Sequence, residues 1–162
     1  IGLISFLGDL IVHNKNEVAE NAYHIEIKED GLSSNIASTK SEIIAEPIEM
    51  LLSNASFEKG EKIFKKCSAC HTHKKDGENK VGPNLWNIIN KTKGKSAGFN
   101  YSKELAEFGG VWTYEEMNQF LYKPKEYIKG TKMNFSGLKK VDDRANLILY
   151  LRELSDSPAN LP

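Results

Sequence analysis

The sequence predicts an all-α domain that begins near residue 56 and follows a separate N-terminal extension. Apolar side chains recur at intervals of three and four residues in two segments, residues 57–67 and residues 147–154, as on one face of a helix. No segment of comparable strength between them has the alternating pattern of a strand. A chain of 162 residues fits one compact domain plus an extension.

The first element is an apolar stretch at residues 1–13. Ile1 to Val12 contain no basic residue, one acid at Asp9 and no initiating Met. A membrane-spanning helix needs about twenty apolar residues, so this stretch alone is too short. We expect residues 1–13 to be the end of a transmembrane anchor helix. The alternatives are a mature end left after signal cleavage and a helix buried against a protein partner.

Residues 14–55 form the second element, an acidic and polar linker rich in Ser, Asn, Glu and Lys. A short helix is expected near residues 42–52. A flexible tether of about forty residues spans on the order of 35 Å root mean square. The domain at residues 56–162 could therefore move relative to the anchor.

Three helices are expected within residues 56–162. The first begins after a Ser56 cap, and its Gly60 would let another helix approach closely. The second begins with Thr113 and Glu116 as a capping box. The third carries two acids in its first turn, where carboxylates favour the positive end of the helix dipole. Its apolar stripe is Leu147, Tyr150, Leu151 and Leu154.

The run Cys67-Ser-Ala-Cys70-His71 carries the chemistry of the domain. In this five-residue signature two thiols bond to the vinyl groups of haem, and the adjacent imidazole ligates the iron. A Cys-x-x-Cys pair can also be a thioredoxin-like redox site in a βαβ context, or half of a zinc site. The chain has only these two cysteines and no second ligand pair at zinc-site spacing. His73 is too close to complete one, so covalent haem is the best interpretation.

Three methionines could supply a second axial ligand to the iron. Met133 lies in the Gly-containing loop Lys129-Gly-Thr-Lys-Met-Asn-Phe135, where a core role is unusual. Met117 shares a helical face with Phe120 and Leu121, which predicts core packing. Met50 is also interpreted as apolar packing.

Residues from about 56 to 154 resemble the single-haem class I cytochrome c family, including mitochondrial cytochrome c. The extension is similar to that of the membrane-anchored cytochromes c of alphaproteobacterial respiratory chains. The matching motifs, in chain order, are Gly60-Glu-Lys-Ile-Phe64, the Cys67–His71 run, Gly82-Pro83-Asn84-Leu85, Gly98-Phe-Asn-Tyr101, Trp112, Pro124-Lys-Glu-Tyr127, Gly130-Thr-Lys-Met133 and Arg144-Ala-Asn-Leu-Ile-Leu-Tyr150.

The resemblance implies the class I cytochrome c fold, with helices wrapped around one covalent haem c. It implies His71 and Met133 as the two iron ligands, a pair that raises the reduction potential relative to two nitrogen ligands. The Pro83 carbonyl would accept the His71 ring N–H and fix its orientation. Tyr101 and Trp112 would donate to a haem propionate.

Three positions depart from the mitochondrial pattern of this family. Lys91 stands in place of an arginine near the propionates, Phe120 in place of a tyrosine, and Lys129 in place of a proline. We expect a shifted reduction potential and a more labile Met133 ligand, because a polar group and a backbone restriction are lost.

Charge is divided unevenly along the chain. Residues 1–58 hold 3 Lys against 10 acids, whereas residues 59–162 hold 19 Lys or Arg against 12 acids. The domain is therefore basic, which suits fast, salt-sensitive docking to acidic redox partners. No recognition motif for nucleic acid accompanies the charge. Nine lysines flank the haem motif or the Met133 loop: Lys65, Lys66, Lys80, Lys123, Lys125, Lys129, Lys132, Lys139 and Lys140.

These observations together predict an electron-transfer protein that is not an enzyme. We expect a membrane-tethered carrier on the periplasmic side of a bacterial inner membrane, passing electrons from a cytochrome bc complex to a terminal cytochrome c oxidase. It could be a member of a supercomplex of these partners. The alternatives are a fixed haem c subunit of a larger respiratory oxidoreductase and a peroxidase or sensor with an open sixth site. The last would require Met133 to be displaced.

Overall fold

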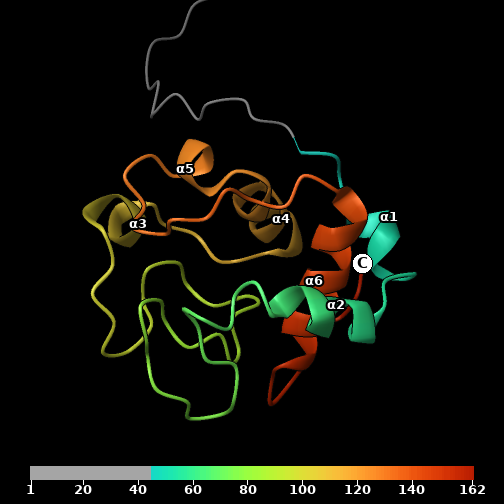
Figure 1. Ribbon diagram of the computed structural model, residues 1–162, viewed down its shortest axis with the longest axis horizontal. Helices are drawn as coiled ribbons and strands as arrows, with labels where there is room; N and C mark the ends of the chain where they lie inside the picture. The colour runs from blue at the N-terminus through green and yellow to red at the C-terminus, as the bar shows by residue number, and fades with distance from the viewer. Residues whose placement is uncertain (1–44) are drawn as a thin grey trace, which may run out of the picture. The chain divides into compact units, whose positions relative to one another are not determined.

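The computed structural model describes residues 45–162 (Figure 1). Their regular structure is helical, as predicted, and the one pairing of extended backbone within this range is an isolated bridge between Thr92 and Val111. The helices are α1 (Glu49–Leu52), α2 (Phe57–Phe64), α3 (Lys103–Glu107), α4 (Tyr114–Tyr122), α5 (Pro124–Tyr127) and α6 (Val141–Glu153).

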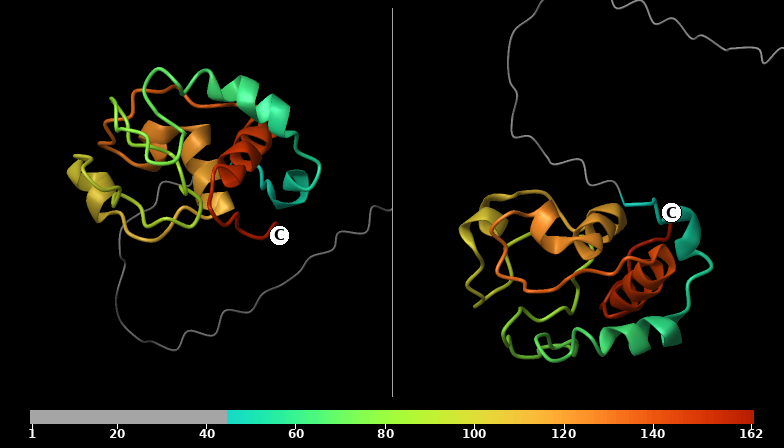
Figure 2. Two further views of the ribbon diagram at one scale, coloured as in Figure 1. Left: turned by 90° about the horizontal axis from the view of Figure 1, so that it is seen from below. Right: turned by 45° about the horizontal axis from the view of Figure 1, so that its top comes forward.

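Helices α2 and α6 cross against each other, and this contact organises the domain (Figures 1 and 2). Gly60 lies at the crossing, where an added Cβ would stand 2.1 Å from the Asn146 carbonyl oxygen and 2.6 Å from the Tyr150 Cβ. Beside it, the ring centroids of Phe64 and Tyr150 are 5.3 Å apart. The close approach expected at Gly60 is thus confirmed, because the absence of a side chain lets the two backbones meet.

The predicted Ser56 cap marks the start of α2. The Ser56 hydroxyl accepts a hydrogen bond from the Lys59 N–H at 3.2 Å, and the Ser56 N–H donates to the Asn146 side chain at 2.7 Å. Helix α2 is therefore tied to α6 from its first residue. Asp142 and Asp143 occupy the first turn of α6, as expected from the helix dipole.

Residues 45–55, which the sequence assigned to the polar linker, pack against the domain instead. Ala45, Ile48 and Leu52 are at most 1% exposed and belong to the core or its edge. The Ala45 N–H donates to the Gln119 side chain of α4 at 3.0 Å. Met50, expected to pack in the core, is 88% exposed. The domain thus begins before residue 56, and the short helix expected near residues 42–52 corresponds to α1, Glu49–Leu52.

Arg144 joins this segment to α4 and α6 from a fully buried position. Its guanidinium donates to the Asn118 side chain at 2.7 Å, to two backbone carbonyls just before α6 at 2.8 Å each, and to the Glu46 carboxylate at 2.9 Å. The Asn118 side chain also donates to the Glu46 carbonyl at 2.9 Å. A buried cation is tolerated here because several acceptors surround it.

Helix α4 begins as predicted at Thr113, whose hydroxyl accepts from the Glu116 N–H at 3.1 Å. The Glu116 carboxylate also contacts Lys93 and Tyr127, and so connects α4 to two other parts of the domain. Met117, Phe120 and Leu121 are buried on one face, as their spacing predicted.

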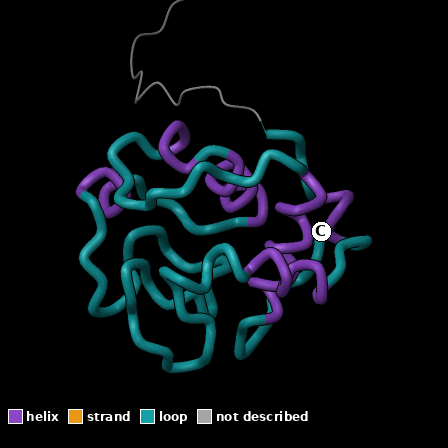
Figure 3. The backbone as a smooth tube through the Cα atoms, viewed as in Figure 1, coloured by secondary structure: helices purple, strands orange, loops and turns teal. Residues whose placement is uncertain are grey.

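The long loop after α2 and the elements from α4 to α6 lie on opposite sides of the domain interior. Figure 3 shows that the chain between α2 and α3 is long loop, while α4, α5 and the segment leading to α6 lie across from it. None of the helices within residues 45–162 is long and apolar enough to cross a membrane. The anchor predicted at residues 1–13 and most of the predicted linker lie outside the described residues.

Candidate functional site

A largely apolar cavity lies between the loop that follows α2 and the elements from α4 to α6. It brings together every site residue predicted from the sequence. The predicted residues that line it are Cys67, Cys70, His71, Pro83, Tyr101, Trp112 and Met133. Apolar residues of several helices complete the walls, among them Leu105, Met117, Phe120, Leu121, Leu147 and Leu151.

The two cysteines are presented by a turn that continues from α2. Helix α2 ends at Phe64, whose carbonyl accepts from the Cys67 N–H at 2.7 Å. The Cys67 carbonyl then accepts from the N–H groups of Cys70 and His71 at 3.0 and 2.9 Å. The Cys-x-x-Cys-His spacing thereby places both sulfurs and the imidazole on one cavity.

The His71 ring is held by its backbone surroundings. Its Nδ1 lies 2.7 Å from the Pro83 carbonyl oxygen, so Nδ1 carries the proton and Nε2 remains free to act as a ligand. The ring also lies against Gly82, where an added Cβ would come within 2.3 Å of His71 Cε1. Burial lowers the pKa of His71, which favours the neutral imidazole that binds a metal.

Met133 reaches the cavity from the loop between α5 and α6. Its backbone N–H donates to the Thr131 hydroxyl at 3.3 Å, and the neighbouring Lys132 ammonium donates to the Asn100 carbonyl at 2.9 Å. Farther along, Gly137 has φ +90°, and an added Cβ there would stand 1.9 Å from the Tyr122 carbonyl oxygen. The loop is therefore fixed at several points although Lys129 replaces a proline.

Tyr101 precedes α3 in the chain and Trp112 follows it, and both residues line the cavity. Trp112 is 6% exposed, and its backbone exchanges hydrogen bonds with the 90–91 segment, donating to the Lys91 carbonyl and accepting from the Asn90 N–H, each at 2.9 Å. The Tyr101 ring packs edge-on against Phe99 at 4.7 Å. Both residues line the cavity, and their role as donors to a haem propionate stays a prediction.

The surroundings of Cys67 bear on which chemistry this site supports. Burial raises the pKa of Cys67 to about 11, so its thiolate is disfavoured. Reactive and metal-binding cysteines have lowered pKa values instead. Among residues 45–162 no three His, Cys, Asp or Glu side chains group as metal ligands. The thioredoxin-like and zinc interpretations therefore lack their requirements in the described part of the chain.

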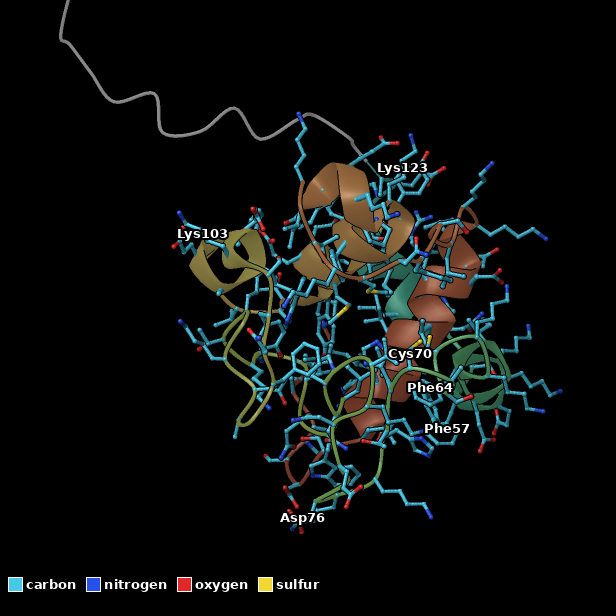
Figure 4. All side chains as sticks on the ribbon, turned by 60° about the vertical axis from the view of Figure 1, so that its left-hand side comes forward. Phe57, Phe64, Cys70, Asp76, Lys103 and Lys123 are labelled. Carbon is cyan, nitrogen blue, oxygen red and sulfur yellow. The ribbon has the colours of Figure 1, made fainter. Side chains whose placement is uncertain are left out.

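The residues present fit a covalently attached haem. Two thiols and an oriented imidazole lie on one wall, a thioether lies on the same cavity, and the remaining lining is apolar. Some lining residues are exposed and mark where the cavity opens to solvent, namely Lys66, Cys70, Val81, Lys132 and Asn134. In Figure 4, Lys103 and Lys123 lie toward the top of the view and Asp76 at the bottom, with Cys70 between them.

Comparison with known proteins bears directly on this interpretation of the cavity. Residues 57–155 match the cytochrome c family. The chain belongs to the cytochrome c family. It is 44% identical over 144 residues to a cytochrome c homolog of Bradyrhizobium diazoefficiens, a match that covers 86% of this chain and 76% of that protein.

Two further relatives differ in how much of this chain they match. A cytochrome c homolog of Rickettsia typhi is 37% identical over 150 residues, covering 93% of this chain and 85% of that protein. A cytochrome c of Chlamydomonas reinhardtii is 46% identical over 96 residues, covering 59% of this chain and 86% of its own length. The Rickettsia match includes most of residues 1–44, whereas the algal match has the length of the haem domain.

Family membership confirms the resemblance drawn from the sequence motifs. The protein is a class I cytochrome c that carries covalently bound haem c, and its activity is electron transfer and not enzymatic conversion. Cytochrome c family members attach haem through the Cys-x-x-Cys-His run, which here is Cys67 to His71.

One feature of the site was not predicted from the sequence. Lys93, which looks like one more surface lysine, is only 3% exposed and pairs with Glu116 close to Trp112. Glu116 was explained by its position in a capping box, so its pattern gave no sign of a second partner. Only the packing of the 88–94 segment against α4 brings these two residues together.

Proposed function

We propose that this cytochrome is a membrane-tethered one-electron carrier on the periplasmic side of a bacterial inner membrane. It would pass electrons from a cytochrome bc complex to a terminal cytochrome c oxidase through a haem ligated by His71 and Met133. The observation that carries the proposal is that both side chains line one cavity whose opening is flanked by lysines. That arrangement would combine iron ligation by two side chains with a basic docking surface.

The residues of the chain have distinct roles in this proposal. A bound haem iron supplies the one-electron chemistry, cycling between two oxidation states. His71 is oriented by Pro83, and Met133 by the loop contacts at Thr131 and Lys132. The apolar lining would limit contact between water and a bound haem.

Met133→Ala tests the ligation. The whole protein with haem attached should show the far-red absorption of a sulfur-to-iron bond when oxidised, and the variant should lose it and bind cyanide or carbon monoxide. Met117→Leu is the matched control, because it removes the other cavity-lining thioether and should leave the band in place. A wild-type protein without the band would instead favour the open-site peroxidase or sensor.

The lysines at the opening provide the test of partner docking. Lys66 and Lys132 are exposed lining residues, and Lys80 is the exposed neighbour of Val81. Electrostatic steering of this kind raises association rates at low ionic strength and is screened by salt. The rate of oxidation by cytochrome c oxidase should therefore fall with added salt above the low-salt optimum.

Lys66→Glu should slow both reduction by the bc complex and oxidation by the oxidase several-fold at low salt, with little effect at high salt. Lys103→Glu makes the same charge change on α3, outside the cavity lining, and serves as the control. Equal effects of the two variants would contradict a docking surface at the opening and indicate that net charge alone matters.

The tether is supported by the apolar character of residues 1–13. Salt-washed membranes from cells that make the whole protein should retain the haem, and detergent should release it. Release by salt would contradict an anchor. Isolation only in a fixed complex with another respiratory enzyme, even at high salt, would favour the alternative of a permanent haem-bearing subunit.

A further inference from the structure

Lys93 is a buried cation in the wall of the haem domain. Its side chain is 3% exposed, and its Nζ lies 2.6 Å from the Glu116 carboxylate. Two aromatic rings lie beside the ammonium group, since the Nζ is 4.8 Å from the Phe108 centroid and 5.3 Å from the Trp112 centroid. Lysine is almost never fully buried without a partner, so the pairing with Glu116 explains why Lys93 can be buried here.

Tyr127 completes the group from α5. Its hydroxyl donates to the Glu116 carboxylate, and burial together with that carboxylate raises the pKa of Tyr127, so the phenol stays protonated. Glu115, next to Glu116 on α4, accepts from the side chains of Asn118 and Gln119. Lys93 and Glu116 thus form a pair of opposite charges, the protonated Tyr127 adds none, and the Glu115 carboxylate lies on the same turn of α4.

This group lies one side-chain layer outside the haem cavity. Trp112 separates Lys93 from the cavity and is itself part of the lining. Glu116 precedes the lining residue Met117 on α4, and Tyr127 packs against the lining residue Phe120 with centroids 6.4 Å apart. A charge buried so close to the cavity acts on the haem with little screening by water.

We propose that the balance of charge between Lys93 and Glu116 tunes the reduction potential of the haem from behind Trp112. Reduction adds one negative charge to the haem, so a nearby cation favours the ferrous state and a nearby anion favours the ferric state. The intact pair nearly cancels. This inference rests on haem c in the cavity and does not depend on the membrane tether or the redox partners of the proposed function.

If charge tunes the haem, removing Lys93 and removing Glu116 should shift the reduction potential in opposite directions. Lys93→Met removes the cation and should lower the midpoint potential, whereas Glu116→Gln removes the anion and should raise it. Each shift should correspond to about a fivefold change in the equilibrium with a reference couple, about 41 mV for one electron. The double variant, which restores neutrality, should return close to the wild-type potential.

The measurement is a spectroelectrochemical titration of the whole haem-loaded protein. Lys75→Met is the matched control, because Lys75 forms a similar pair with Asp156 at 2.6 Å but the two side chains are 60% and 46% exposed. Its shift should be much smaller, since water and salt screen an exposed pair. The far-red band should persist in every variant, which separates tuning from loss of Met133.

A second readout is the free energy of unfolding by denaturant. The two single variants should each lower it, and the double variant should lower it by less than the sum of the singles, because the pair is coupled. Shifts of the potential with the same sign in both single variants would overturn the proposal and leave a purely structural link between the 88–94 segment and α4. Unchanged potentials in all variants would also overturn it.

Discussion

The crossing of α2 and α6 leaves no room for a side chain at Gly60, so Gly60→Ala is a direct test of how the domain is held together. The added methyl group would stand 2.1 Å from the Asn146 carbonyl oxygen, where 3.4 Å is the start of ordinary contact. The helices would have to separate by roughly 1.3 Å at this point. The obstacle is backbone, which cannot move aside by changing rotamer.

The expected cost follows from two opposing effects. Overpacking of this kind destabilises by about 1–3 kcal/mol and sometimes more, and an immovable backbone obstacle places Gly60 at the upper end. Alanine is about 1 kcal/mol more favourable than glycine within a helix. We therefore expect a net loss of about 2 kcal/mol in the free energy of unfolding, measured by guanidinium titration with far-ultraviolet circular dichroism.

Lys59→Ala is the control, because Lys59 is the exposed neighbour of Gly60 on α2. It should change the free energy of unfolding by no more than about 0.5 kcal/mol. A Gly60→Ala protein as stable as wild type, or more stable, would refute the reasoning. It would mean that the crossing adapts freely and that the glycine is not required for close packing.

Three other predictions concern the surroundings of the cavity. Arg144→Met should lower the free energy of unfolding by about 3 kcal/mol in a urea titration. The substitution removes a fully buried guanidinium and leaves its four acceptor groups without that donor. A loss under about 1 kcal/mol would contradict this expectation. Gly137→Ala should weaken or abolish the far-red band, because its φ of +90° and the Tyr122 carbonyl both exclude a side chain and the Met133 loop must shift; an unchanged band would show that the loop absorbs the strain elsewhere. Asp156 accepts from Lys75, Trp86 and Asn87, and these bonds, led by the one from Lys75, lower its pKa below the ordinary 3.8. Its contribution is therefore present above pH 3.8 and lost as the pH falls through the lower folded pKa, so the stability advantage of wild type over Asp156→Asn should shrink at acid pH in unfolding titrations from pH 6 to pH 2.

Local sequence patterns predicted the main helices and their starts. Ser56 and Thr113 cap α2 and α4 as their residue types and spacing indicated, and the stripe that includes Leu147 and Leu151 is buried on α6. These features depend on contacts within a few residues, which is why one segment at a time was enough to recognise them. The Cys67–His71 run is equally local and identified the haem chemistry.

The role of a segment was harder to predict where it depends on distant partners. Residues 45–55 look like linker by composition, yet Ala45 and Ile48 are buried because α4 and α6 offer them a surface. Met50 was wrongly expected in the core, since apolar character alone does not say which face of a four-residue helix turns inward. The anchor at residues 1–13 stays a prediction.

The sequence by itself determined that this protein is a haem-binding, all-helical cytochrome c, because the attachment run and the helix signals are short-range and each residue type has a specific chemical reason. The tertiary structure decided what surrounds the cavity. It placed Met133 on the same cavity as His71, fixed Arg144 among distant acceptors, and buried Lys93 against Glu116. These pairings join residues far apart in the chain, so only the packing of helices and loops could select them.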